Sequence, residues 1–133
     1  MKPYEAYEKA AKQRYGTHEL ESIIATDAVW SHHYAKYVIK GRWEPGEAII
    51  VTDDYYPYLY AKNVIKGRWE PGEASIATDD WHSYLYAKNV IKGRFPLCEP
   101  VISKSVYWED YLEFIPMTSE EKTFLILKYG APK

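Results

Sequence analysis

Apolar and polar positions follow a helical period along much of this chain, and the same pattern returns every 26 residues. The block from Tyr34 to Arg42 recurs from Tyr60 to Arg68 and again from Tyr86 to Arg94. A short fixed period is typical of repeat proteins, whose units bury their apolar faces against one another. The three full copies are 17–42, 43–68 and 69–94.

A longer helix is predicted in the second half of each copy. In the second copy Tyr60 and Val64 lie four residues apart, and so do Ala61 and Ile65. Residues at this spacing share one side of a helix, so they form an apolar stripe. The lysines at positions 62 and 66 fall outside the stripe, and we expect them in solvent.

Local signals set the limits of this helix. Thr52, Asp53 and Asp54 precede it, and side-chain oxygens at such positions accept hydrogen bonds from the free amides of a first helical turn. Gly67 is predicted to end the helix, because glycine adopts the left-handed conformation without strain. The predicted helix runs from about Asp54 to Lys66.

Residues Glu47 to Val51, in the first half of the copy, are predicted to form a short helix. Five residues do not distinguish a helical period from a strand period. Pro45 suits a first helical turn, and Glu47 favours a helix N-terminus. A strand followed by a helix within 26 residues would more often show a leucine-rich repeat pattern, which this chain lacks.

Shorter segments at both ends are predicted to cap the array. Thr118 and Glu121 form a capping-box pattern before the apolar run Phe124 to Leu127, and Gly130 ends that helix. The predicted fold class is therefore all-α, a single-domain helical-repeat solenoid of 26-residue units with capping helices. Its outer parts are an N-terminal cap at 1–16, a degenerate repeat at 95–115 and a C-terminal cap helix at 116–133.

The stretch from Tyr60 to Ala74, Y-A-K-N-V-I-K-G-R-W-E-P-G-E-A, resembles a short two-helix repeat of small bacteriophage-encoded proteins, most of which have no assigned function. The likeness is specific to the V-I-K-G-R-W core and covers residues 17 to about 115. Residues 70–73 read Glu-Pro-Gly-Glu where such repeats more often read Pro-Glu-Ala-Glu. The resemblance implies a phage origin and a host-directed binding role, including inhibition of a host defence system. It carries over no catalytic residue.

Composition and charge narrow the classes of protein. Hydrophobic residues make up 47% of the chain and charged residues 27%, which is the balance of a folded protein. A net charge of −2 gives no overall positive field for nucleic acid or anionic lipid. The longest apolar run is far below the roughly 20 residues that span a bilayer, and no signal-peptide pattern is present. We therefore expect no membrane association and a location in the cytoplasm of a bacterial host.

Aromatic residues are abundant, with 14 Tyr and 5 Trp, and some of them form a candidate partner-binding ladder. The copies differ most in the first turn of the longer helix, while its second half hardly changes. Repeat scaffolds often vary the residues that contact a partner on a constant frame, and aromatic side chains contribute strongly to interfaces. The alternative is that these rings fill gaps between units, and sequence position does not decide between the two. The candidate partner-binding residues are Trp30, Tyr55, Tyr56, Trp81 and His82.

Lysines and arginines recur in register and form a candidate basic edge. This edge would suit a nucleic-acid-binding repeat protein in which Trp43 and Trp69 stack on bases. A full copy nevertheless has a slight acidic excess, so we expect ion pairs between units. The two tryptophans directly follow the predicted helix stop and are expected to pack beneath the next unit. The residues of the candidate basic edge are Lys36, Lys40, Arg42, Lys62, Lys66, Arg68, Lys88, Lys92 and Arg94.

No arrangement of residues in the sequence points to catalysis. The histidines include no metal-binding pair at i,i+4 spacing and none stands beside a plausible nucleophile. The rings of His32 and His33 diverge by about 100° on a helix, and we expect both to be partly exposed. Cys98, the only cysteine, excludes an internal disulfide and is expected to be a small buried or incidental thiol. We therefore expect no enzymatic activity, no catalytic residue, no cofactor and no metal site.

These observations predict a phage-type module that binds a host protein and inhibits it by binding. A nucleic-acid-binding repeat protein that uses the stacked basic residues is the main alternative. A structural or self-associating role is the third possibility.

Overall fold

The computed structural model describes all 133 residues, and helices are its only regular secondary structure. This confirms the all-α class and the choice of a helix for residues 47–51. The α-helices are α1 (Pro3–Gln13), α2 (His18–Ile24), α3 (Ala28–Tyr34), α4 (Glu47–Ile50), α5 (Tyr56–Tyr60), α6 (Glu70–Ile76), α7 (Asp80–Tyr86), α8 (Glu99–Ile102), α9 (Trp108–Phe114) and α10 (Ser119–Tyr129).

Shorter helical turns extend several of these helices. A π-helical turn continues each of α3, α5 and α7, and a 3-10 turn precedes α4 and α8. The predicted longer helix of the second copy is therefore α5 together with its π turn. The π turns are η1 (Ala35–Ile39), η3 (Ala61–Ile65) and η4 (Ala87–Ile91), and the 3-10 turns are η2 (Glu44–Gly46) and η5 (Pro96–Cys98).

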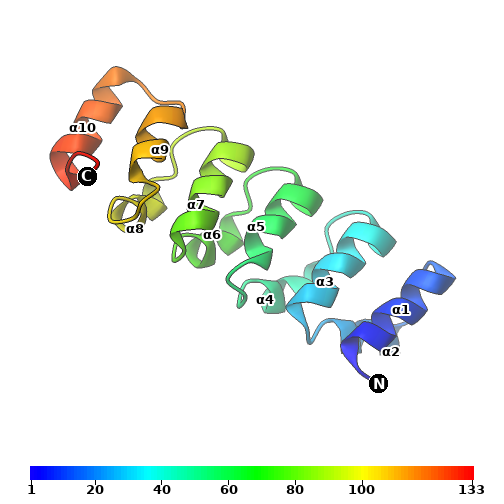
Figure 1. Cartoon of the computed structure of the whole chain (residues 1–133). Coiled ribbons are helices and arrows are strands. Elements are labelled where there is room, and N and C mark those ends of the chain that lie inside the picture. Colours follow the sequence, from blue (N-terminus) through cyan, green and yellow to red (C-terminus); the bar gives the residue numbers. More distant parts are fainter.

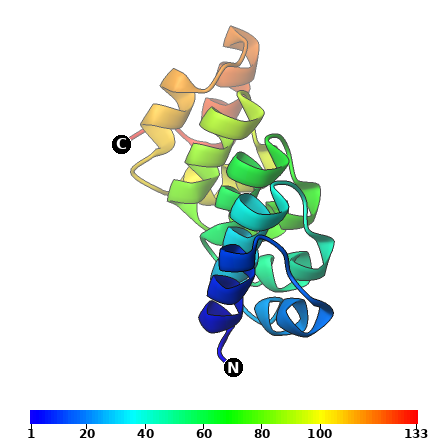
Figure 2. The same cartoon turned by 90° about the vertical axis from the view of Figure 1, so that its right-hand side faces the viewer.

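Two rows of helices run along the molecule (Figure 1). The row formed by α1, α3, α5, α7 and α9, called the long-helix row below, has the shorter helices α2, α4, α6 and α8 packed against it. Successive members of the long-helix row contact each other from α1 to α7. Figure 2 shows the helices following one another from one chain end to the other.

Aspartates begin three helices of the long-helix row. The Asp27 carboxylate accepts a hydrogen bond from the Trp30 amide at 3.1 Å, and Asp79 accepts one from the His82 amide at 2.7 Å. Asp53 does the same for α5. These bonds satisfy amides that have no partner within the helix, as the sequence predicted.

The ends of these helices differ from the prediction. Lys66, and not Gly67, has the left-handed conformation, with φ of 60°. The π turn explains this shift by one residue, because the Ala61 carbonyl accepts hydrogen bonds from the amides of both Lys66 and Gly67. A side chain at Gly67 would meet no atom within 4 Å. The prediction that Gly67 is the helix stop was therefore wrong.

The core consists of the same positions taken from successive units. Trp43 and Trp69 are buried, with 6% and 2% exposed surface, so they pack between units as expected. Cys98 is completely buried. Other buried side chains that recur are Ile24, Ile50, Ile76 and Ile102, and Tyr34, Tyr60, Tyr86 and Tyr111.

The last helix covers the C-terminal end of this core. Thr118 accepts a hydrogen bond from the Glu121 amide, and the Glu121 carboxylate accepts one from the Thr118 amide, which confirms the predicted capping box. Leu125 is fully buried, and the Trp108 indole donates a hydrogen bond to the Gly130 carbonyl at 2.9 Å.

Candidate binding face

Arginine, glutamate and tyrosine form a recurring polar cluster between successive units. Arg68 donates two hydrogen bonds of 2.9 and 3.0 Å to Glu73, and the Tyr86 hydroxyl donates one of 2.6 Å to the same carboxylate. The Tyr86 hydroxyl also accepts a bond from the Trp69 amide. Burial, followed by the bond to Glu73, raises the pKa of Tyr86 well above its usual value, so the hydroxyl remains a donor.

The cluster occurs in three successive units, so it neutralises three arginines of the candidate basic edge. This confirms the expected ion pairs between units. The other two clusters are Arg42 with Glu47 and Tyr60, and Arg94 with Glu99 and Tyr111.

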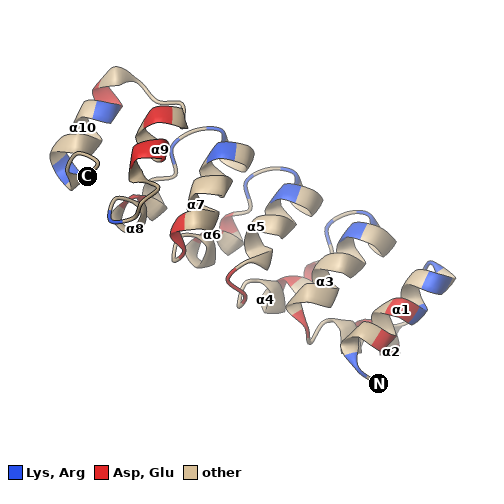
Figure 3. Ribbon diagram, viewed as in Figure 1, with Lys and Arg blue, Asp and Glu red and all other residues tan.

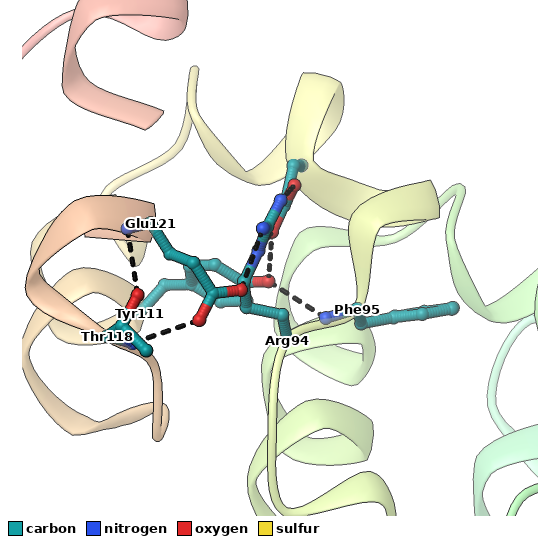
Figure 4. A network of polar contacts seen from close by, with 6 residues as sticks. Arg94, Phe95, Tyr111, Thr118 and Glu121 are labelled. Carbon is teal, nitrogen blue, oxygen red and sulfur yellow. Dashed lines mark hydrogen bonds and ion pairs between the residues drawn. The ribbon is translucent and has the colours of Figure 1, made fainter. Parts of the chain in front are cut away.

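The last of these clusters also holds the C-terminal cap. Figure 4 shows Arg94 reaching Glu121, with a distance of 3.0 Å between the Arg94 Nη1 and the Glu121 carboxylate. Tyr111 lies beside them and accepts a hydrogen bond from the Phe95 amide at 2.9 Å. The same arginine thus joins α10 to the rest of the protein.

The lysines of the candidate basic edge lie apart from these clusters. They gather at the C-terminal ends of α3, α5 and α7, where Figure 3 shows blue segments. None of them has a carboxylate within 4.0 Å, so their charges are not paired within the chain. We call these residues the lysine row: Lys36, Lys40, Lys62, Lys66, Lys88 and Lys92.

Aromatic rings bridge every neighbouring pair of the long-helix row. Trp30 lies 5.2 Å from the Tyr7 ring, and Tyr56 lies 5.2 Å from the His32 ring, measured between ring centroids. In each case the ring contacts the preceding helix of the row and is half-buried. His82 packs on Tyr58 and Tyr107 packs on Tyr84 in the same way. We call the complete set the bridging ladder: Trp30, Tyr56, His82 and Tyr107.

Tyr55 and Trp81, called the exposed pair below, occupy a different position. Their side chains are 42% and 43% exposed. Tyr55 rests against His82 at 4.8 Å, and Trp81 rests against Tyr107 at 5.0 Å. The five candidate partner-binding residues therefore separate into the exposed pair and three members of the bridging ladder, which pack between helices.

His32 is buried, so the expectation that it is partly exposed was wrong. Only 3% of its surface is exposed, and neither ring nitrogen has a hydrogen-bond partner. Burial, together with the nearby His33 and Lys36, lowers the pKa of His32 to about 4. The ring packs on Tyr56, which accounts for its burial, while His33 is half-buried as expected.

Sequence reasoning missed Tyr107 and the Glu–Tyr bonds. Tyr111 follows Glu99 by 12 residues, whereas Tyr86 follows Glu73 by 13, so one residue is absent from the fourth unit. This deletion placed Tyr107 out of register with His82. The presence of Glu99 at its expected position was the signal that could have revealed the shift.

No three histidine, cysteine or acidic side chains are grouped so that they could hold a metal ion. None of the helices combines the length and apolar character that crossing a bilayer requires. The chain matches no protein-family model, no curated protein and no solved structure, so its function is inferred from its own residues.

Proposed function

We propose that the chain is a short α-solenoid of 26-residue units, capped at both ends, that binds a partner protein through the outer side of its long-helix row. The polar clusters, the bridging ladder and a left-handed lysine at positions 40, 66 and 92 recur with a spacing of 26 residues, which shortens to 25 at Tyr107 and Tyr111 in the fourth unit. This recurrence supports the architecture. A solenoid of this kind presents equivalent positions side by side, which provides an extended surface for a partner.

The exposed pair is the observation on which the binding role rests. These two exposed rings lie at the position where the copies vary, and repeat scaffolds often vary the residues that contact a partner. Aromatic side chains also contribute strongly to the energetics of interfaces. Each ring of the pair leans on a ring of the bridging ladder, so little freedom is lost when a partner covers it.

The partner we propose is a bacterial host protein, a host factor or a component of host defence, which the module inhibits by occupying its surface in the host cytoplasm. The resemblance to phage repeats supports this choice. Nucleic acid is less well supported, because Trp43 and Trp69 are buried and the three arginines are engaged by glutamates. Inhibition by occupancy requires no catalytic group.

A capture experiment tests this function. The tagged protein is incubated with bacterial lysate, the retained protein is identified by mass spectrometry, and its affinity is then measured with purified components. Changing Tyr55→Ser and Trp81→Ser together should abolish capture, since each interface anchor is worth about 2 kcal/mol or more.

A matched control removes exposed apolar surface elsewhere. Phe124 and Leu127 on α10 are 53% and 81% exposed. Changing both to Ser should leave capture unaltered. Capture that survives loss of the exposed pair, or that is lost equally in the control, contradicts the proposed face.

A further inference from the structure

A basic residue occupies the left-handed conformation at the end of each of the first four long segments. The φ angles are 71° at Arg14, 60° at Lys40, 60° at Lys66 and 58° at Lys92. A side chain at such a φ is strained, and glycine is the residue that avoids the strain. The three lysines are each followed directly by a glycine whose φ is not positive. In these three units a lysine therefore adopts the strained left-handed conformation, although a glycine is the next residue.

The positive charges of these four residues are not neutralised by a carboxylate of the chain. None of the four makes an ion pair with a carboxylate, and three of them belong to the lysine row. Arg14 and Lys40 both line a hollow of about 510 Å³ between the ends of α1 and η1. Lysines at helix ends interact favourably with the helix dipole, but that effect does not require the strained position.

The lysine row does not continue on α9. Lys88 follows Tyr86 by two residues and Glu113 follows Tyr111 by two, so Glu113 is the equivalent of Lys88, and α9 also contains Glu109 and Asp110. Figure 3 shows the change from blue to red along the long-helix row. A negatively charged ligand is therefore attracted by the ends of α1, α3, α5 and α7 and repelled by α9.

The distance between neighbouring units of the lysine row matches the repeat distance of an extended polypeptide. Neighbouring packed helices lie about 8–10 Å apart. Three residues of an extended polyproline II chain span about 9 Å and complete one turn, so every third side chain points to the same side. An acidic residue at every third position would therefore meet one unit after another. The rings nearest Lys62 and Lys88 include Tyr58 and Tyr84, which are buried. The exposed rings Tyr37 and Phe114 lie beside Lys36 and Lys88 at the two ends of the lysine row, so bases of a nucleic acid would find no continuous stacking platform along it.

We propose that Arg14, Lys40, Lys66 and Lys92, with the rest of the lysine row, bind an extended acidic segment of the partner protein. This rests on the proposed protein-binding function and adds the chemistry of the partner to it. The exposed pair makes apolar contacts with the partner on the same row of helices. The lysine row, together with Arg14, determines which acidic residue of the segment lies against which unit.

Glycine substitution tests the proposal without harming the fold. The variant Lys40→Gly/Lys66→Gly/Lys92→Gly relieves strain, so its melting temperature should equal or exceed that of the wild type. The probe is a fluorescein-labelled peptide that repeats Glu-Gly-Ser four times. Its binding is measured by fluorescence anisotropy at about 50 mM salt, where screening of charges is weak. Binding should weaken about tenfold, the sum expected of three exposed ion pairs.

Two further variants and two further probes complete the test. Lys36→Gln/Lys62→Gln/Lys88→Gln should also weaken binding, whereas Lys104→Ala/Lys122→Ala/Lys133→Ala, with the same loss of charge elsewhere, should not. A peptide of equal composition with its glutamates adjacent should bind more weakly than the spaced peptide. The proposal is overturned if the wild type does not bind the spaced peptide, if the control lysines matter equally, or if oligothymidylate of equal charge binds more tightly.

The outcome is separable from that of the proposed function. If the glycine variant still captures the protein partner with unchanged affinity while the Tyr55→Ser/Trp81→Ser variant does not, the acidic segment is wrong and the binding face stands. If neither variant affects capture, both proposals fail.

Discussion

The ring of Trp69 leaves no room for a side chain at Gly72. A Cβ atom at Gly72 would lie 2.5 Å from Cε3 of Trp69, which is closer than real atoms approach. The preceding unit repeats the relationship, with 2.7 Å between a Cβ at Gly46 and the Trp43 ring. The glycine is therefore required by the size of the ring, and not by the conformation of the turn, since neither glycine has a positive φ.

The fourth unit has a smaller ring and a larger partner at these two places. Phe95 replaces the tryptophan and Cys98 replaces the glycine, and both are buried. In the first unit the pair is Thr17 and Leu20. Where the first side chain is smaller, the second is larger, so the two together fill the same space. Cys98 is therefore a packing residue.

Changing Gly72→Ala should destabilise the protein by about 1–3 kcal/mol, because overpacking forces the Trp69 ring to move. The double change Trp69→Phe/Gly72→Cys copies the fourth unit and should recover much of this loss. Urea denaturation of the single and double variants measures the coupling. Additive effects of the two changes would show that the positions do not share one space.

Lys66→Gly should stabilise the protein by about 1 kcal/mol, because it removes a side chain from the left-handed conformation. Gly67→Val should change stability by less than about 0.5 kcal/mol, since a side chain there meets nothing. Both values come from thermal or urea unfolding. A large loss for Gly67→Val together with none for Lys66→Gly would return the helix stop to Gly67.

Local chemistry made much of the fold predictable. Asp27, Asp53 and Asp79 act over three residues of chain, and a capping interaction of that range can be read from the sequence. The apolar stripe from Tyr60 to Ile65 was equally visible. The π turn was not, because its only trace is a lysine in a conformation that lysine does not favour.

The candidate site was less predictable, because it depends on how units stack. The bond between Tyr86 and Glu73 joins residues 13 apart, and no local rule pairs them. Trp30 and Trp81 look alike in the sequence as variable aromatic positions. Trp30 is half-buried between α1 and α3, whereas Trp81 is 43% exposed, and this difference follows from a shift of one residue within the helical turn.

Glu73→Gln should destabilise the protein by about 2 kcal/mol at pH 7, as expected for a buried charge that accepts several hydrogen bonds. Burial alone would raise the pKa of Glu73, but hydrogen bonds from Arg68 and Tyr86 outweigh burial and leave the pKa below its usual value. The carboxylate therefore stabilises the fold above about pH 4.5, and this contribution is lost as the pH falls through the lowered pKa. Urea unfolding at pH 7 and pH 3 should show the gap between wild type and variant closing in acid.

His32→Tyr should stabilise the protein and remove part of its acid sensitivity. Tyrosine is present at the equivalent positions 58 and 84. Tyr58 accepts a hydrogen bond from Asn89, and the equivalent donor for a tyrosine at position 32 is Asn63.

The sign of this pH effect follows from the lowered pKa of His32. The unfolded chain binds a proton near pH 6.5, while the folded protein does not until about pH 4. Stability is therefore complete above pH 6.5 and falls as the pH drops toward 4, by up to about 1.4 kcal/mol per pH unit. Unfolding of wild type and variant across this range measures the difference, with His18→Gln, an exposed histidine, as the control. An equal pH dependence in all three proteins would exclude His32 as its source.

The exposed pair and the bridging ladder should respond in opposite ways to the same substitution. Trp30→Ser/Tyr56→Ser removes two half-buried rings that join α1 to α3 and α3 to α5, so it should cost about 2 to 4 kcal/mol of stability for each ring. Tyr55→Ser/Trp81→Ser removes rings that each keep more than two fifths of their surface in water, and it should cost about 1 kcal/mol or less for each. Circular dichroism at 222 nm during thermal unfolding gives the stability, and titration with the captured partner gives the affinity. The ladder variant, where it is still folded, should retain affinity, and the exposed-pair variant should lose it with little change in melting temperature. Equal destabilisation by the two variants would mean that Tyr55 and Trp81 belong to the core, since the loss of binding would then follow from the loss of the fold.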